Sequence, residues 1–494
     1  MTSNGRLVAI VGSVVHSVAF GTLELITNGA VCHRNGIITA VFDLDKQPDA
    51  IGNVDEIIDH KGKLIMPGFI DAHCHAPQYA FTGTGMDLPL LEWLNKYTFP
   101  IESKFKDEVY ARYAYDKAVR RHLKSGTTFC AYYGTIDLEA SKVLAETVLT
   151  LGQRAFVGKV NMDRNSPDFY VEETSKGCDD AEAFARHVLG MTPSGKDFMS
   201  GVDRDSEATV EGMQAAGVAT SAGFEKRPTL LNKADSPLVL PILTPRFVPT
   251  CTAEMMHRLG FISYKYGLPV QSHLSESIAE IAWVKDLHPD CSTYAEVYNS
   301  CNLLHSSTIM GHCCFSNAEE RSLLHRKNAT VVHCASSNFN LCSGVMDVRL
   351  FMADGIRVGL GTDVAGGHSA SMLDCMRQSL VASRVVGFDQ RGKDESSKTV
   401  SIHKTPVEYP PMSYMEMFHL ATVGSAEALG MGDVVGNFKV GKVMDCLVVD
   451  TDCKDSPIDV FDHEGMIEKF QKFLFLGDDR NIQSIYVHGN KVNP

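Results

Sequence analysis

The stretch Met66-Pro-Gly-Phe-Ile-Asp-Ala-His73-Cys-His75 is an apolar run that ends in two histidines. Side chains alternate along a β-strand, so residues two apart project to the same side, and His73 and His75 can reach one metal ion. A pair of histidines at this spacing also occurs without a metal. The stretch therefore predicts a strand with two candidate metal ligands at its end. Whether the histidines bind a metal depends on which other ligands the chain supplies.

Apolar runs of strand length recur along the chain and are separated by helical stretches, which is typical of βα units around a parallel sheet. One helix is expected over Asp107–Lys124, because Gly126 can end it, and Ser316 with Glu319 predicts a capping box before Arg321–Arg326. The pattern favours an α/β fold with a (β/α)8 TIM-like barrel, which carries its chemistry at the C-terminal ends of the strands. The eight expected strands are Leu64–Ile70, Thr127–Tyr132, Arg154–Val160, Leu238–Leu243, Pro269–Ser272, Thr308–Met310, Ala329–Val332 and Ile356–Leu360.

The two ends of the chain carry short alternating segments instead. We expect residues 1–63 and 434–494 to join into a small β-sandwich domain, with residues 64–433 forming the barrel; two separate appendages are the alternative. Stretches near 176–236 and 389–411 interrupt the barrel pattern and are interpreted as surface insertions, the first with an extra helix around Ala181–Leu189.

Composition narrows the class of protein. A net charge of −14 over 494 residues argues against a nucleic-acid or anionic membrane partner, so a small-molecule substrate is expected. No apolar run approaches the length of a membrane span, and the fourteen cysteines are scattered through apolar segments instead of forming a disulfide framework. We expect a soluble, cytoplasmic protein with free thiols.

Three further polar residues follow later strands: His273, His312 and Asp363. A barrel gathers the ends of its strands around one axis, so these side chains are expected to lie near the first two histidines. Imidazoles with a carboxylate suit zinc, although iron or another first-row metal is an alternative. Such an ion activates water, and Glu276, three residues after His273, is placed to move the proton.

A family resemblance enters at these residues. The chain resembles the amidohydrolase superfamily through Pro67–His75, His273, His312, Gly361-Thr-Asp363 and Gly441-Lys-Val-Met-Asp445. The resemblance covers nearly the whole chain and implies a barrel with a β-sandwich built from both termini. Within the superfamily, the stretches similar to the guanine deaminases are Asp87–Phe99, Gly152–Lys159, Thr244–Phe247, Gly361–Gly367 and Phe473–Asn481.

The resemblance implies roles for the metal-site residues. It implies hydrolysis of guanine to xanthine, with Glu276 moving protons and His312 orienting the attacking water. It implies one zinc ion per chain, held by His73, His75, His273 and Asp363. Catalytic roles then fall to Glu276, His312 and Asp363.

The resemblance also implies recognition of the base. Arg246 offers donors that match the acceptors O6 and N7 of guanine, Gln78 can donate and accept, and Phe247 can stack on the ring. Residues of the metal site expected to lie against the substrate are His75, His273, Glu276 and Asp363. A homodimer is a further implication of the resemblance. Trp93 could line the pocket, but an aromatic at helical spacing is more often a core residue, so we expect it in the core and leave it out of the site.

Departures from the family pattern keep alternatives open. Strand four ends at Leu243-Thr244 without the lysine that binuclear members use, which favours one metal over two. The stretch His333–Asn338 carries Ala-Ser where the family favours Pro-Asn, and Ser336–Leu341 can form part of the pocket wall. The alternatives are a deaminase or hydrolase of another heterocycle, such as a pterin or a modified purine, and a catalytically silent scaffold.

Overall fold

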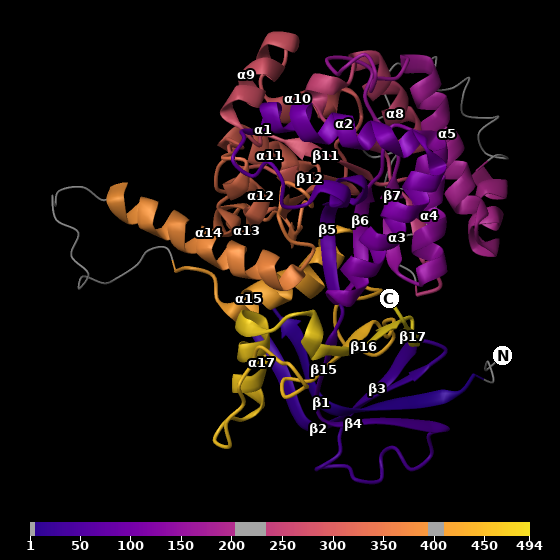
Figure 1. The fold of residues 1–494 in the computed structure, drawn as a ribbon, viewed down its shortest axis with the longest axis vertical. Coiled ribbons are helices and arrows are strands. Elements are labelled where there is room, and N and C mark those ends of the chain that lie inside the picture. The colour runs from indigo at the N-terminus through magenta and orange to yellow at the C-terminus, as the bar shows by residue number, and fades with distance from the viewer. Residues whose placement is uncertain (1–4, 203–233, 394–409) are drawn as a thin grey trace.

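A computed structural model describes residues 5–202, 234–393 and 410–494 of the chain. It has a mixed α/β architecture (Figure 1), with parallel strands in the upper part of the view and a sheet from both chain ends in the lower part. None of the helices in these ranges has the length and apolar content that crossing a membrane would require. Residues 203–233 and 394–409, where much of the two expected insertions falls, lie outside the described residues.

Two four-stranded parallel sheets lie at the centre of the upper part. Their orders are β5-β6-β7-β9 and β11-β12-β13-β14, and a parallel bridge between Leu243 and Val270 links the end of one to the start of the other. The strands are β5 (Phe69–His75), β6 (Thr127–Tyr133), β7 (Arg154–Gly158), β9 (Val239–Pro241), β11 (Val270–Leu274), β12 (Thr308–His312), β13 (Thr330–His333) and β14 (Val358–Leu360). The short strands β8 (Val160–Asn161) and β10 (Thr244–Pro245) pair separately.

The first predicted strand is wrong in its boundaries. Leu64–Ile70 is divided between two strands, because β4 (Glu56–Pro67) ends in the terminal sheet and β5 begins at Phe69. Both runs are apolar, so periodicity does not reveal the change of sheet. Gly68 permits it, since a Cβ at this position would lie 2.0 Å from Thr128 Oγ1. The other seven predicted strands coincide with strands of the parallel sheets within a few residues.

Strands from both ends of the chain form one seven-stranded sheet of order β17-β16-β15-β4-β1-β2-β3. All its pairings are antiparallel except that of β1 with β4. Residues of its strands, Ile10, Val31 and Val448 among them, belong to a separate apolar cluster. The strands not yet given are β1 (Leu7–Ala19), β2 (Thr22–Arg34), β3 (Ile37–Asp43), β15 (Cys446–Val449), β16 (Ile482–Val487) and β17 (Asn490–Val492).

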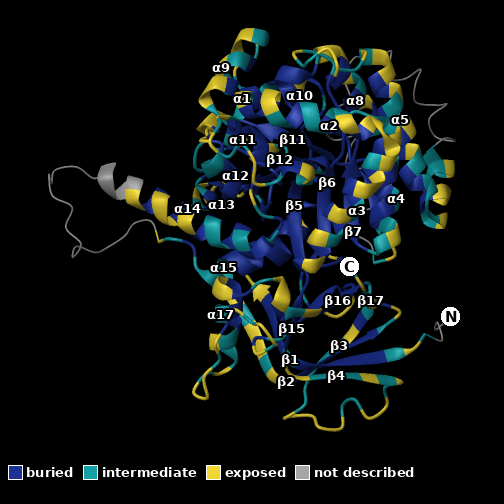
Figure 2. Cartoon of the chain, viewed as in Figure 1, coloured by how far each residue is buried: buried dark blue, intermediate teal, exposed yellow. Residues whose placement is uncertain are grey.

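Helices cover the parallel sheets and bury their apolar faces, while their outer faces are exposed (Figure 2). The helix α3 (Glu108–Lys124) has Asp107 as its N-cap, as predicted to within one residue. The helix α5 (Thr174–Gly190) confirms the extra helix predicted around Ala181–Leu189. The capping box at Ser316 is wrong: the cap of α11 (Ala318–Arg326) is Asn317, whose side chain accepts from Glu320 N.

Further α-helices are α1 (Leu90–Trp93), α2 (Phe99–Glu102), α4 (Leu138–Leu151), α8 (Ala253–Tyr266), α9 (Ile278–Leu287), α10 (Tyr294–Ser300), α12 (Ala335–Asn340), α13 (Val348–Ala353), α14 (Met372–Lys393), α15 (Tyr414–His419), α16 (Ser425–Ala428) and α17 (Met466–Leu476). The short helices α1, α2 and α12 lie at the ends of the parallel strands.

Candidate metal centre and substrate pocket

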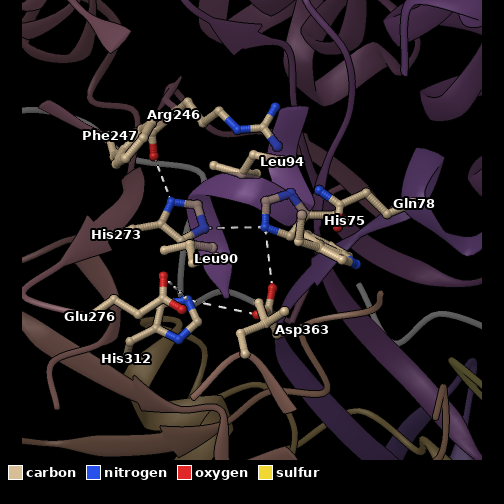
Figure 3. Close-up of a pocket in the computed structure, with 12 residues that line it drawn as sticks. His75, Gln78, Leu90, Leu94, Arg246, Phe247, His273, Glu276, His312 and Asp363 are labelled. Carbon is tan, nitrogen blue, oxygen red and sulfur yellow. Dashed lines mark hydrogen bonds and ion pairs between the residues drawn. The ribbon is translucent and has the colours of Figure 1, made fainter. Parts of the chain in front are cut away.

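Strand β5 places two histidines at the C-terminal ends of the parallel strands. The Nε2 atoms of His73 and His75 each lie 3.3 Å from Oδ1 of Asp363, which follows β14. Figure 3 shows the contact between His75 and Asp363 in the pocket. All three side chains are buried. The sequence-predicted pair of histidines therefore meets the predicted carboxylate directly.

A third imidazole comes from β11. Nε2 of His273 lies 3.2 Å from Nε2 of His75, and its Nδ1 lies 2.6 Å from the carbonyl oxygen of Arg246. A carbonyl only accepts, so Nδ1 of His273 carries the proton and donates. The lone pair of its Nε2 is then directed at the cluster, which is the arrangement that a metal-ligating histidine adopts.

The donor set fits a metal ion. Ligand atoms of His73, His75, His273 and Asp363 all lie within 4.8 Å of one another. His73 Nε2 is buried and makes no hydrogen bond, although Asp363 Oδ1 lies 3.3 Å away, which leaves a ligand atom to be satisfied. Burial lowers the pKa of His73 to about 4 and that of His273 well below its usual value. Neutral imidazoles with a carboxylate are the protonation states in which these residues bind metals.

Two glycines make room for the first histidine. A Cβ at Gly311 would lie 2.7 Å from His73 Cε1, and one at Gly361 would lie 2.7 Å from His73 Cβ. Larger residues at either position would displace the imidazole. The glycines at the ends of β12 and β14 therefore leave room for the imidazole of His73 beside the backbone.

Asp71, in the stretch Met66–His75, fixes the backbone around the candidate metal site. Asp71 Oδ1 accepts hydrogen bonds from the backbone N–H groups of Thr362, at 3.0 Å, and His73, at 3.2 Å. The Thr362 hydroxyl donates to the other carboxylate oxygen. These bonds tie β5 to the segment carrying Asp363, so ligands 290 residues apart keep one relative position.

Glu276 and His312 lie beside the donor set. His312 Nε2 is 3.6 Å from Glu276 Oε2 and 3.7 Å from Asp363 Oδ2. Burial raises the pKa of Glu276, and the charge of Asp363 adds to this although His312 opposes it. Burial alone would lower the pKa of His312, but Glu276 and Asp363 raise it above its usual value. The pair can therefore hold and exchange a proton next to the metal site.

Two residues that sequence reasoning missed hold this pair. Ser343 Oγ donates to Glu276 Oε1 at 2.7 Å, and Asn338 Oδ1 lies 2.8 Å from His312 Nδ1. Asn338 belongs to the stretch where the chain departs from the family pattern. No spacing rule connects an asparagine in α12 with a histidine in β12, so only the fold could reveal the contact.

The donor set opens into one pocket (Figure 3). Arg246, Phe247 and Gln78, which are expected to recognise the base, line it. Trp93 is buried in the core, as expected, and lines the pocket as well. Helical spacing does not distinguish a core aromatic from one that also borders a pocket. Apolar residues that line the pocket and were not predicted are Leu90 and Leu94; Leu341 lies in the stretch expected to form its wall.

Residues 64–492 match the model of the amidohydrolase family. This match includes both parallel sheets and every residue of the site described above. The chain therefore belongs to the amidohydrolase family.

Relatives within that family narrow the class further. Guanine deaminase of Dictyostelium discoideum is 39% identical over 506 residues, which cover 100% of this chain and 99% of the relative. Guanine deaminase of Mus musculus is 39% identical over 447 residues, 89% of this chain and 85% of the relative. The crystal structure of guanine deaminase from C. acetobutylicum with bound guanine matches with a TM-score of 0.81 and 33% identity, covering 99% and 100% of the two chains. The chain is a member of the guanine deaminases.

Proposed function

We propose that this protein catalyses the hydrolytic deamination of guanine to xanthine and ammonia. The observation that carries the proposal is a single pocket that brings together three groups of residues. It holds the cluster of candidate metal ligands, the carboxyl group of Glu276, and the hydrogen-bond donors of Arg246 and Gln78. Full-length similarity to guanine deaminases and to a guanine-bound relative supports the choice of substrate.

The metal would be one zinc ion. His73, His75, His273 and Asp363 would hold it, because their donor atoms converge and because burial lowers the pKa of His73 and of His273, which favours their neutral, ligating form. When bound, zinc supplies Lewis acidity that makes a water molecule nucleophilic at neutral pH. The other catalytic steps belong to the side chains of the chain itself.

Glu276 would move the protons. It takes a proton as water attacks C2 of guanine and delivers one to the ring nitrogen beside that carbon, and the second proton of the water leaves with ammonia. A raised pKa suits a carboxyl group that must both accept and release a proton. His312, held by Asn338, lies between Glu276 and Asp363 and would orient the water.

Arg246, Gln78 and Phe247 would recognise the base. The guanidinium and the amide NH2 group are donors, and guanine offers acceptors at O6 and N7. Phe247 lies on the same side of the pocket (Figure 3) and would stack on the ring. His75, His273, Glu276 and Asp363 would contact the reacting edge of the base.

The test is a spectrophotometric assay of guanine loss and xanthine formation, with metal content measured on the same sample. We expect turnover with about one zinc ion per chain, a Glu276→Gln variant that keeps the metal and loses turnover, and a His73→Gln variant that loses both. Glu182→Gln is the control, because Glu182 also accepts from a cation and a tyrosine hydroxyl but lies outside the pocket. Metal-loaded protein that leaves guanine unchanged would overturn the substrate and favour a pterin or a modified purine. Protein without metal would favour a catalytically silent scaffold.

The architecture that we propose is a (β/α)8 barrel with a terminal β-sandwich. Supporting observations are the bridge between Leu243 and Val270, the packing of β14 beside β5, and the bridge between Ile37 and Val443, which joins an edge of the terminal sheet to the chain before β15. The domains would be 1–63 with 434–494, and 64–433, with insertions near 176–236 and 389–411.

Assembly and compartment complete the proposal. All fourteen cysteines are free thiols and most are buried, which suits a reducing cytoplasm. We propose a homodimer, as the resemblance implies. Light scattering on the purified protein tests this, and a measured mass equal to that of one chain would contradict it. Localisation of the tagged protein to an oxidising compartment would contradict the cytoplasmic assignment.

A further inference from the structure

Glu102, the last residue of α2, is a fully buried carboxylate that the proposed reaction does not yet use. Its Oε1 accepts from Gln78 Nε2 at 2.9 Å and from Arg246 Nη2 at 3.1 Å. Its Oε2 accepts from Arg246 Nη1 at 2.7 Å and from the Tyr170 hydroxyl at 2.8 Å. One carboxylate therefore holds both polar side chains that line the base-recognition wall of the pocket.

The bonds to Glu102 decide which way the amide of Gln78 points. Gln78 Oε1 accepts from the backbone N–H of Ala365 at 3.1 Å, while Nε2 donates to Glu102. An ionised carboxylate only accepts and a backbone N–H only donates, so the flipped amide would face donor with donor and acceptor with acceptor. The side chain is thus fixed with its NH2 group on the Glu102 side.

The same carboxylate fixes the guanidinium of Arg246. Two parallel N–H bonds to Glu102 set the plane of the group, and the ring of Phe99 lies 5.3 Å from its central carbon. Burial alone would raise the pKa of Glu102, but the charge and hydrogen bonds of Arg246 hold it below its usual value. Glu102 is therefore ionised and balances the buried charge of Arg246.

We propose that Glu102 is the positioning residue that makes this wall of the pocket donor-only and so selects a purine with a carbonyl at C6. The inference rests on the proposed function. With the carboxylate in place, neither Gln78 nor Arg246 presents an acceptor to the base, so a C6 amino group would meet donors only. A neutral amide at position 102 can both donate and accept, so it would be compatible with both orientations of the Gln78 amide. It would also leave Arg246 without its counter-charge.

The experiment compares guanine with 2,6-diaminopurine, which keeps the reacting 2-amino group and carries an amino group at C6. In Glu102→Gln, we expect the ratio of kcat/KM values, guanine over 2,6-diaminopurine, to fall roughly 10- to 100-fold. The KM for guanine should rise more than kcat falls, because Glu102 does not touch the reacting atoms. The metal content should not change. Glu182→Gln is the matched control and should keep the wild-type ratio.

A second variant keeps the test decisive if Glu102→Gln does not fold. Tyr170→Phe retains the carboxylate and removes one of its four hydrogen bonds, and we expect the KM for guanine to rise roughly 3- to 10-fold with kcat unchanged. A substrate ratio and a KM equal to those of wild type in the folded variants would overturn the inference. If the wild type turns over neither purine, the proposed function fails, and the ratio of equilibrium dissociation constants for the two purines in wild type and variant still decides the role of Glu102.

Discussion

Asn338 shows how a residue outside the pocket fixes one inside it. Its amide oxygen lies 2.8 Å from His312 Nδ1, and an amide oxygen only accepts, so Nδ1 carries the proton. The other ring nitrogen faces Glu276 and Asp363. One hydrogen bond thereby selects both the orientation and the tautomer of the imidazole that is proposed to orient water.

We expect Asn338→Ala to lower kcat for guanine by roughly 10- to 100-fold, because the ring of His312 loses its fixed orientation. The measurement is steady-state kinetics together with metal content, which should stay at the wild-type level. Asn340→Ala, in the same helix, is the control; Asn340 bonds to the Gly366 carbonyl and not to His312. An unchanged kcat in Asn338→Ala would mean that the orientation of His312 is set by other contacts.

At the scale of elements, the short helix α1 forms an apolar wall of the pocket. Leu90 and Trp93 line the pocket from this helix, and Leu94 lines it directly after the helix. The indole N–H of Trp93 donates to the carbonyl of Thr84 at 3.3 Å. The segment is reached through Gly83 and Gly85, both with positive φ. Trp93 is one of only two tryptophans in the chain, so it can report on events in the pocket.

We expect the fluorescence of a Trp283→Phe variant, which keeps only Trp93, to change on titration with xanthine, because a purine would replace water beside the indole. The Trp93→Phe variant, which keeps only Trp283 in α9, should show no change. Equal responses of the two variants would place the bound base away from α1. The titration is read as emission intensity and wavelength at fixed protein concentration.

A second element-scale feature is the junction of α8 with the start of β12. His305 Nδ1 accepts from the backbone N–H of Ser307 at 3.3 Å, and its Nε2 lies 3.1 Å from Ser263 Oγ. Ser263 donates its own proton to the Leu268 carbonyl, so Nε2 of His305 is the donor in their contact. The imidazole is neutral and its two nitrogens are both satisfied.

Burial lowers the pKa of His305 to about 3, and the charge of Lys327 acts in the same direction. The unfolded chain, with a histidine pKa of about 6.5, binds this proton between pH 3 and 6.5 when the folded chain does not. Stability therefore falls as the pH drops below 6.5, by about 2 kcal/mol at pH 5 from this residue. Urea unfolding at pH 7.5 and pH 5 checks this, since His305→Asn should lose that part of the pH dependence. The same pH dependence in both proteins would show that His305 is accessible to protons in the folded state.

For the whole molecule, one buried ion pair joins the terminal sheet to the parallel sheets. Arg154 Nε in β7 donates to Asp445 Oδ2 at 3.1 Å, and Asp445 Oδ1 accepts from the backbone N–H of His488 at 2.7 Å. Both charged side chains are buried. The aspartate of the Gly441–Asp445 motif thus has a structural role, because it links two parts of the fold.

We expect Asp445→Ala to lower the free energy of unfolding by about 3 to 5 kcal/mol, because it leaves the charge of Arg154 buried and unpaired. The KM for guanine in the folded fraction should stay the same, since neither residue lines the pocket. Asp479→Ala is the control, as its pair with Arg121 is largely exposed and contributes about 0 to 1 kcal/mol. Urea unfolding measures both, and equal stabilities of the two variants would contradict the role of Asp445.

The sequence by itself determined most of the parallel strands and the candidate metal donors at their ends. Apolar runs ending in polar residues are local signals, and His73, His75, His273 and Asp363 each follow or end such a run, so their meeting is a consequence of parallel strands sharing one edge. Only the tertiary structure decided the residues that hold this site in place. Glu102 bonds to Arg246 144 residues away, and Asn338 bonds to His312 from another helix. Such bonds depend on where short helices cross the strand ends. Periodicity in the sequence predicts helices and strands, but it does not predict which side chains of distant segments come into contact.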